Sequence, residues 1–599
     1  MHVALEILFK NIFAYLIKER GVDGDLVRRL VRENKIYLSR SHNNLVMVDY
    51  DSEGKARFAT NKEINDTFRT IPFEPAKWRK GKNLPRDLPG AMVLGYQGEP
   101  GHVKAMVDTS DSHTMVISST GGGKTTFFLI PNLEMTCACG YSFLVTDTKG
   151  DNFRDFAGIA QKYYGYTPYV IDLRNPTRSH GFNIMHLVNK YMDLFKETGD
   201  ISCKARAERY AKITAKTIVH MDGFTEGGQN TFFYDAAEGL IAAIILLVSE
   251  FCGEGERHIV SVFKLIKELL ETHPGKGKGQ NDFRVLFSML PPDHKASWLA
   301  GAALDTADQS MYSVLSTAMS RLLSFIDSEL EQILCFESDV DAEQFCEGKT
   351  AVFIVFPEED STKRFLISLF INQLYNESIT IANQGGENRL DKRVIFYIDE
   401  FGTIPKLNDA EGMFSASRSR NIILVPILQS MAQLNRNYGR DGAQIILDDC
   451  QNVVFGGISP LSKSADELSK ALGNQTVQSG SVSHGGNGLD RRSSSTSLQM
   501  IQKPLMTAEQ IRSLPQDQWI LMKSRRHPMI TTIRRYDQWG IQLDCPYSVP
   551  QNESRTVKYA SKQELMQAVQ ETYLSPVEEE MPDFEDTSTA RMNDDLLDS

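Results

Sequence analysis

The sequence predicts an α/β fold in which a largely parallel sheet is interrupted by an all-helical insertion. Short apolar strands alternate with helical segments from about residue 91 to 185, and again from 346 to 545. A glycine-rich loop joins one of these strands to the next helix, and a long run of helical periodicity separates the two α/β stretches. Strands that alternate with helices indicate βαβ units, which place neighbouring strands in parallel.

Seven apolar runs are expected to be strands of this sheet. Each is short and is bounded by polar or turn-forming residues, as buried strands are. They are residues 113–118, 141–146, 168–172, 350–356, 394–398, 422–425 and 452–455. Between them, apolar spacing predicts helices at 125–139 and 363–382.

The stretch from about 186 to 345 shows helical spacing with few strand signals. Helices are expected there at 205–220, 232–251, 259–270 and 313–334, with a loop at 274–280. The apolar run 239–248 is too short to span a bilayer and is expected to be a buried helix. Residues 478–497, rich in serine and glycine, are expected to be a mobile loop or a linker.

Length and composition indicate several globular domains. The chain has 599 residues, of which 41% are hydrophobic and 24% charged, and this excludes wholesale disorder and a multi-span membrane protein. We divide it into an N-terminal region without transmembrane spans (1–90), an α/β domain in two parts (91–185 and 346–545), the insertion (186–345) and a C-terminal extension (546–599) with an acidic tail. Residues 1–17 predict an amphipathic helix, and the acidic stretch after about 575 predicts a solvated tail.

The net charge leaves nucleic acid open as a partner. Lysine and arginine total 65 against 77 aspartate and glutamate, a net charge of −12, but binding depends on local basic patches. The basic run 77–82 is either a solvated linker or a contact to nucleic acid or anionic lipid. The 8 cysteines show no zinc-ligand spacing and indicate reduced thiols in a cytosolic protein.

The strongest chemical signal is the loop Ser118–Thr125, which follows a strand and opens a helix. Glycines let backbone N–H groups approach phosphate oxygens, and the helix N-terminus adds a positive dipole end. Lys124 can reach the β and γ phosphates, and the Thr125 hydroxyl can ligate Mg²⁺. Ser118 stands where the pattern has its first glycine, which is tolerated while its φ stays negative. The expected nucleotide contacts are Ser119, Thr120, Gly121, Gly122, Gly123, Lys124, Thr125 and Thr126.

A second signal is the apolar strand 394–398 that ends in Asp399 and Glu400. Asp399 would hold the hydrated Mg²⁺ and Glu400 would polarise the attacking water, whereas a carboxylate that caps the next helix is the structural alternative. Further on, Gln429 could sense the γ-phosphate at a strand end.

Arg418 or Arg420 could reach a neighbouring subunit as an arginine finger, or could be a solvated charge at a helix end. Asp147 and Lys149, which follow another strand, are either site residues or members of a structural turn.

These residues resemble the type IV secretion coupling proteins, the conjugative DNA-transfer ATPases of the TraG/TraD group. The resemblance covers about residues 90–540, with motifs at Thr120–Thr125, Asp147–Asp151, His180–Met185, Asp399–Gly402 and Leu428–Gln433. It implies a RecA-like P-loop NTPase motor domain with an all-helical insertion. It also implies an Mg-dependent ATPase with ATP and Mg²⁺ as cofactors. Carried over by position, the catalytic residues are Lys124, Glu400, Arg418 and Gln429, and the metal ligands are Thr125 and Asp399.

The resemblance implies a function as well. We expect a coupling protein that recruits and pumps single-stranded DNA with its relaxase into a type IV secretion channel, working as a homo-hexamer. The transmembrane helices typical of the family's N-terminus are missing, so we expect a cytoplasmic protein, peripheral at the cytoplasmic face of the cell membrane, with a small membrane-anchoring partner. The alternatives are a double-stranded DNA translocase for replicon segregation and a non-translocating receptor for protein secretion.

Overall fold

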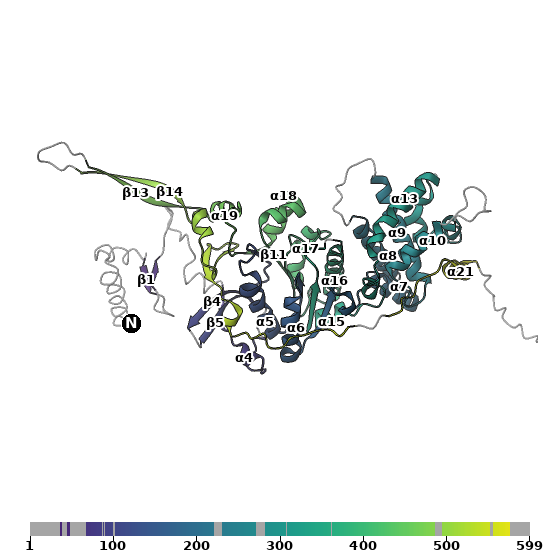
Figure 1. Cartoon of the computed structure of the whole chain (residues 1–599), viewed down its shortest axis with the longest axis horizontal. Helices are drawn as coiled ribbons and strands as arrows, with labels where there is room; N and C mark the ends of the chain where they lie inside the picture. The colour runs from purple at the N-terminus through teal and green to yellow at the C-terminus, as the bar shows by residue number, and fades with distance from the viewer. Residues whose placement is uncertain are drawn as a thin grey trace, which may run out of the picture.

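A computed structural model describes residues 36–38, 45–47 and 68–574, except positions 87, 89, 100–101, 221–230, 271–281, 307, 361, 485–493 and 552–554. Its centre is a nine-stranded sheet of order β16-β15-β12-β6-β11-β10-β7-β9-β8 (Figure 1). The strands from β12 to β8 are parallel to one another, while β15 and β16 form an antiparallel edge. Their bounds are β6 (Thr114–Ile117), β7 (Ser142–Asp147), β8 (Thr167–Asp172), β9 (Thr350–Val355), β10 (Val394–Ile398), β11 (Ile422–Leu428), β12 (Asn452–Phe455), β15 (Gln518–Lys523) and β16 (Met529–Thr532). All seven predicted strands therefore lie in this sheet.

Both faces of the sheet are covered by an apolar core. Successive side chains of a strand point to opposite faces, so each strand contributes to both cores. In β10, Ile395 and Tyr397 join one apolar core, whereas Phe396 and Ile398 join the other. The first core is closed by α5 (Ile130–Cys139), α6 (Asp151–Tyr164) and a small antiparallel sheet, β3 (Arg69–Pro72), β5 (His102–Asp108) and β4 (Met92–Glu99). The second is closed by α16 (Phe365–Gln384), α17 (Ala410–Ser417), α18 (Met431–Asp449) and the helical insertion. Burial on both faces explains the unbroken apolar strands.

The small sheet refines the division of the chain. β3 pairs with β5 in antiparallel register from Arg69–Val107 to Pro72–Lys104. A boundary at residue 90 therefore cuts through this sheet, and the residues from β3 onward pack on the motor.

The helical insertion occupies the connection between β8 and β9, which are neighbours in the sheet. It runs from α7 (His186–Thr198) through α8 (Ile201–Val219), α9 (Thr231–Phe251), α10 (Ile259–Leu270), α11 (Asp282–Ser288), α12 (Lys295–Leu304), α13 (Asp308–Leu322) and α14 (Glu331–Leu334) to α15 (Ala342–Glu347). Among the described residues, α9 alone is long and apolar enough to cross a membrane by length and composition. It packs against α8, α10, α12 and α13, and residues 240–248 are buried. We therefore assign it to the core of the insertion, as predicted for 239–248.

One predicted helix is wrong in extent. The single helix expected at 313–334 ends as α13 at Leu322, continues as the 3-10 turn Leu323–Phe325, and resumes as α14. The chain turns helical again where the Asp327 carboxylate caps the next turn, by accepting hydrogen bonds from the backbone N–H groups of Glu329 and Leu330 at 2.9 and 3.0 Å.

The loop expected at 478–497 is also wrong. β13 (Asn474–His484) and β14 (Ser494–Pro504) form an antiparallel hairpin with eleven residues in each strand. It follows α19 (Ser464–Leu472) and projects away from the body of the molecule, at the end opposite the helical insertion (Figure 1). The N-terminal helix expected at 1–17, the loop at 274–280 and the acidic tail lie outside the described residues.

The C-terminal extension crosses the motor and ends on the insertion (Figure 1). The Tyr547 N–H donates to the Arg154 carbonyl of α6. Farther along, the Ala560 N–H donates to Ser261 Oγ of α10 over 3.0 Å. The terminal helix α21 (Lys562–Tyr573) then packs on α9 and α10. This segment ties the insertion to the motor.

Candidate active site

The phosphate loop lies between β6 and the helical turn that opens at Lys124. Ser118 N donates to the Leu428 carbonyl over 3.0 Å, and Ser119 N donates to the Gly457 carbonyl over 2.7 Å. Gly121 and Gly123 have φ values of +76° and +90°, which favour glycine. Ser118 is absent from the described residues with positive φ, so the serine fits in place of the pattern's first glycine.

A wide first turn follows the loop. Residues Lys124–Leu129 form a π-helical turn before α5 begins at Ile130, and Pro131 lies in the first turn of α5. Proline lacks an N–H group, so the start of an α-helix tolerates it. The predicted helix 125–139 is thus confirmed, with its first turn widened beside the site.

Lys124 reaches back across the loop. Its side chain is 8% exposed, and Nζ donates to the Ser118 carbonyl over 3.0 Å. The same Nζ lies 3.6 Å from Glu400 Oε1. The lysine from the loop and the carboxylate after β10 therefore lie side by side.

Asp399 and Glu400 follow β10 with different surroundings. Asp399 Oδ1 accepts from the Glu400 N–H over 2.9 Å, and burial together with the neighbouring Glu400 charge raises the pKa of Asp399 to about 7. Glu400 has a φ of +54°, in the left-handed region. A non-glycine residue there carries strain of roughly 1–3 kcal/mol, which is found most often at functional sites.

Gln429, the residue after β11, completes this group. Its Nε2 donates to Glu400 Oε2 over 2.9 Å, and its backbone N–H donates to Gln433 Oε1 over 3.2 Å. Glu400 therefore lies between Lys124 on one oxygen and Gln429 on the other. Three predicted catalytic residues, from the ends of three adjacent segments of the sheet edge, are brought together.

A cavity of about 610 Å³ opens in front of these side chains. Seven of the eight expected nucleotide contacts line it, while Gly122 is the exception. A Cβ built on Gly122 would overlap Ser118 Oγ. Gly122 therefore allows the loop to close on itself.

Thr125 and Asp399 both line the cavity and offer a hydroxyl and a carboxylate. Hard oxygen donors of this kind suit Mg²⁺, which keeps part of its water shell and takes few protein ligands. The residues present therefore fit the metal.

Arg418 lies away from this cavity. It is exposed in the 3-10 turn Arg418–Arg420, before β11, whereas the cavity lies at the end of β11 that carries Gln429. A seven-residue strand separates them by roughly 20 Å. Arg420 is held within the chain, because it donates to Asn383 Oδ1 and to the Ala416 carbonyl at 3.1 and 2.9 Å.

Asp147 is a structural residue at the rim of the site. Its carboxylate accepts from the N–H groups of Lys149, Gly150 and Phe153, at 3.1, 2.9 and 3.0 Å, at the start of α6. Burial raises its pKa despite these bonds. Asp147 and Lys149 still line the cavity, so the structural turn and the site occupy the same place.

Several residues of the site lay beyond the sequence interpretation. Gly457, after β12, approaches the phosphate loop, and Gln516 Nε2 lies 3.4 Å from the Gly121 carbonyl. Tyr536 and Leu543 bring the C-terminal part of the motor to the cavity wall. The glycine pair 456–457 after an apolar strand was the available signal for the first. Nothing local marks the others.

The chain is similar to known coupling proteins in both sequence and fold. A family profile described as Type IV secretory system Conjugative DNA transfer matches residues 66–571, and a profile for a family of unknown function matches residues 14–72. The type IV secretion system-coupling protein VirD4 of Bartonella henselae is 21% identical over 477 residues, covering 78% of this chain and 67% of that protein. The conjugal transfer protein TraG of Rhizobium radiobacter is 25% identical over 491 residues, covering 78% and 66%. The chain thus spans about two thirds of the length of these relatives.

Two solved structures share the fold. The bacterial conjugative coupling protein TrwBdeltaN70 in its unbound form has a TM-score of 0.51 and 16% identity, covering 78% of this chain and 93% of that one. The plasmid coupling protein TrwB in complex with the non-hydrolysable ATP analogue ADPNP has a TM-score of 0.52 and 15% identity, covering 80% and 96%. This likeness supports the predicted RecA-like P-loop NTPase fold with its helical insertion.

Proposed function

Since this chain belongs to the type IV secretory system conjugative DNA transfer family, we propose that it is an ATP-driven coupling protein. It recruits single-stranded DNA with its relaxase and pumps it into a type IV secretion channel. The observation that carries the ATPase is the convergence of Lys124, Glu400 and Gln429 at the phosphate loop. Family membership carries the secretion role.

ATP would place its phosphates over the loop, where backbone N–H groups and Lys124 offset the negative charge. Glu400 orients the attacking water for in-line displacement at the γ-phosphate. The hydrogen bond from Gln429 fixes the orientation of the Glu400 carboxylate. Thr125 and Asp399 would hold Mg²⁺, which would offset charge on the phosphate oxygens. A solved structure of TrwB contains an ATP analogue, which agrees with this use of the fold.

Arg418 completes the reaction from a neighbouring subunit. Its position before β11, at the opposite end of that strand from Gln429, keeps it from the cavity of its own chain, whereas an exposed turn can enter the cavity of another copy. An arginine supplied in this way contributes about 10³–10⁵ in rate. We therefore propose a homo-oligomer, with a hexamer as the number that the family resemblance implies.

Steady-state ATP hydrolysis by the full chain tests the site. We expect Lys124→Ala to lose nucleotide binding and turnover, and Glu400→Gln to keep binding while turnover falls at least about 100-fold. Lys470→Ala, on an exposed face of α19, is the matched control and keeps normal rates. Normal turnover in either site variant would rule out this site.

The cargo is tested by binding rather than by hydrolysis. Lysines at 264, 267, 276 and 278 give part of the insertion a local positive charge that could contact DNA. Lys264 already contacts the C-terminal extension, because its Nζ donates to the Ala560 carbonyl over 3.2 Å. Since α21 packs on the insertion, the full chain is the proper sample. Titration with single-stranded and double-stranded DNA at two salt concentrations distinguishes the three possible cargoes: single-stranded DNA, double-stranded DNA and protein. Preference for duplex favours the alternative, a double-stranded DNA translocase for replicon segregation, and no salt-dependent binding favours a receptor for protein substrates.

The cellular place follows from the same proposal. We place the protein in the cytoplasm, peripheral at the membrane face where a secretion channel opens, with a small membrane-anchoring partner. Fractionation of cells with and without the other channel components tests this. Membrane association that survives their removal would contradict the need for a partner.

A further inference from the structure

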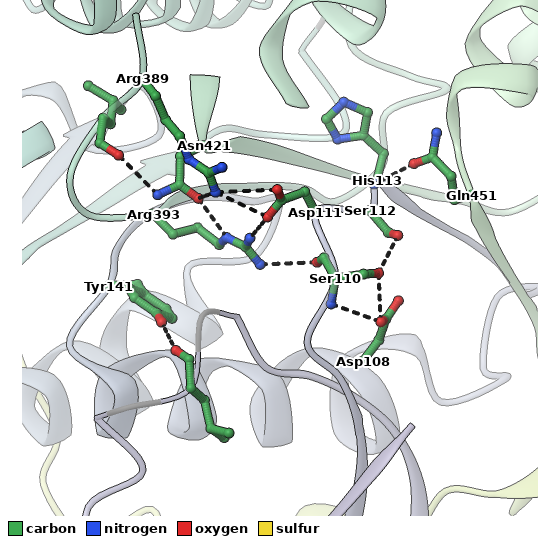
Figure 2. A network of polar contacts seen from close by, with 12 residues as sticks. Asp108, Ser110, Asp111, Ser112, His113, Tyr141, Arg389, Arg393, Asn421 and Gln451 are labelled. Carbon is green, nitrogen blue, oxygen red and sulfur yellow. Dashed lines mark hydrogen bonds and ion pairs between the residues drawn. The ribbon is translucent and has the colours of Figure 1, made fainter. Parts of the chain in front are cut away.

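A buried polar cluster lies where β10 and β11 begin (Figure 2). This is the opposite end of these strands from the cavity. Its centre is Arg393, the residue before β10, whose side chain is 4% exposed. Arg393 donates to Asn421 Oδ1 over 3.0 Å and to the Ser110 carbonyl over 3.2 Å, and it forms an ion pair with Asp111. A buried charge is tolerated only when it is paired and hydrogen-bonded. These three partners supply that, and they come from two other segments of the chain.

Asn421 ends the turn that carries Arg418. Its φ is +65°, in the left-handed region that asparagine tolerates better than most side chains. Its Nδ2 donates to the Leu390 carbonyl over 3.1 Å, while its Oδ1 accepts from Arg393. The end of the turn is therefore fixed to Arg393 through one side chain.

His113 holds the other end of the same turn. Leu424 N donates to His113 Nδ1 over 3.0 Å, so Nε2 carries the proton and donates to the Phe414 carbonyl over 3.0 Å. Ser417 Oγ lies 3.2 Å from the same Nε2. Phe414 and Ser417 belong to α17, which leads into the turn. The turn is thus held at both ends, with Arg418 exposed between them.

The segment that precedes β4 lies on Arg393. Gly90 is buried, and a Cβ built on it would overlap the Arg393 guanidinium. The Tyr141 hydroxyl donates to the Leu88 carbonyl and holds the same segment (Figure 2). A change in the position of Gly90 therefore displaces Arg393, and with it Asn421.

We propose that Arg393 and Asn421 are positioning residues that hold Arg418 for hydrolysis in a neighbouring subunit, and that Gly90 sets their position. The inference rests on the proposed function, since it takes Arg418 as the group that completes another subunit's site. It adds a route by which the N-terminal region acts on hydrolysis. None of these residues lines the nucleotide cavity of its own chain.

The test is ATP turnover by the full chain, alone and in mixtures. Asn421→Gly keeps the left-handed backbone and removes the side chain, and Gly90→Ala pushes on Arg393. For each we expect kcat to fall roughly 10–100-fold with KM for ATP within threefold, because a misplaced catalytic group can cost about 10²-fold. Mixing either variant with Lys124→Ala subunits, which keep an intact Arg418, restores turnover through composite sites. Gly386→Ala, whose Cβ would meet open space, is the control and keeps the normal rate.

Each other outcome has one meaning. If Arg418→Ala itself keeps a normal kcat, the finger proposal fails and this inference fails with it. If Arg418→Ala is slow but Asn421→Gly and Gly90→Ala are normal, the positioning role alone is wrong. A loss that Lys124→Ala subunits do not restore means that the variants damage their own cavity, which also overturns the inference. Thermal unfolding verifies that every variant is folded, and ADP binding verifies the cavity of Arg418→Ala, Asn421→Gly and Gly90→Ala.

Discussion

Gln429 and Glu400, 29 positions apart in the sequence, are joined by a 2.9 Å hydrogen bond from Nε2 to Oε2. Glu400 comes from the end of β10 and Gln429 from the end of β11, which are parallel neighbours. Any change in the charge around Glu400 therefore reaches β11 through a single side chain. β11 is also the strand that begins just after the turn holding Arg418. One strand therefore connects Gln429, which contacts Glu400, to the turn that carries the proposed arginine finger.

Removal of the Gln429 side chain should slow hydrolysis without abolishing binding. For Gln429→Ala we expect kcat to fall about 100-fold, because Glu400 loses the donor that orients it, while the affinity for ADP stays within threefold. Rapid-quench hydrolysis and ADP titration measure the two quantities. Gln444→Ala, on the exposed face of α18, is the control. A normal kcat in Gln429→Ala would show that the bond has no part in catalysis.

Gly122 should matter for nucleotide affinity through space alone. A Cβ at this position would overlap Ser118 Oγ, and overpacking costs about 1–3 kcal/mol. We expect Gly122→Ala to weaken ADP binding about 10-fold or more in calorimetric titration, while Gly386→Ala binds normally. Equal affinity in the two variants would mean that the loop opens freely to admit the methyl group.

The strands and the phosphate loop could be predicted because their signals are local. The strands of β6 to β12 are buried on both faces, so each reads as a continuous apolar run. The loop Ser118–Thr125 combines glycines with a strand before it and a helix after it. Parallel topology then brings Asp399 and Gln429 to the same edge as the loop. The same topology places Arg418 at the opposite edge, because a whole strand separates it from Gln429.

The hairpin and the path of the C-terminal extension (from residue 546, here called the strap) could not be predicted, because their signals are not local. The strands β13 and β14 are rich in serine and glutamine, without the apolar alternation that marks a strand with one buried face. Their order comes from pairing with each other along eleven residues. The strap depends on contacts such as that of Lys562 with Asp282, which lie 280 positions apart. Composition and periodicity carry no signal for such pairs.

His113 should make stability depend on pH below neutrality. Burial lowers the pKa of His113 to about 4 from an ordinary 6.5, and the nearby charge of Arg418 adds to this. The unfolded chain therefore binds a proton that the folded chain refuses between these values, so stability is lost as pH falls from about 6.5 toward 4. The full contribution is on the order of 3 kcal/mol, because each pKa unit corresponds to about 1.4 kcal/mol.

Thermal unfolding between pH 6.5 and 4 measures this dependence. We expect His113→Gln to have a shallower loss of stability than the unaltered protein, although it is less stable at neutral pH. His102→Gln, at an exposed position of β5, keeps the full slope. Identical slopes for His113→Gln and the unaltered protein would assign the pH dependence to other groups.

The ion pair between Lys562 and Asp282 joins the C-terminal extension to the insertion, and its contribution to the free energy of unfolding should be measurable. Lys562 Nζ lies 2.8 Å from Asp282 Oδ2 and 3.2 Å from the Glu268 carbonyl, and the two charged side chains are 15% and 7% exposed. Removal of one partner leaves a buried charge unpaired, which costs about 3–5 kcal/mol in a dry site and less at this exposure.

We therefore expect Lys562→Ala to lower the unfolding free energy of the full chain by about 1–3 kcal/mol. Lys562→Ala with Asp282→Asn should recover part of this loss, because no unpaired charge remains. Denaturant unfolding followed by hydrogen exchange shows where the loss occurs, and it should be concentrated in α10 and α11. Lys470→Ala is the control for loss of an exposed lysine. If the double variant is no more stable than the single one, the strap is held by α21 packing rather than by this pair, because Leu565 and Val569 are its buried residues.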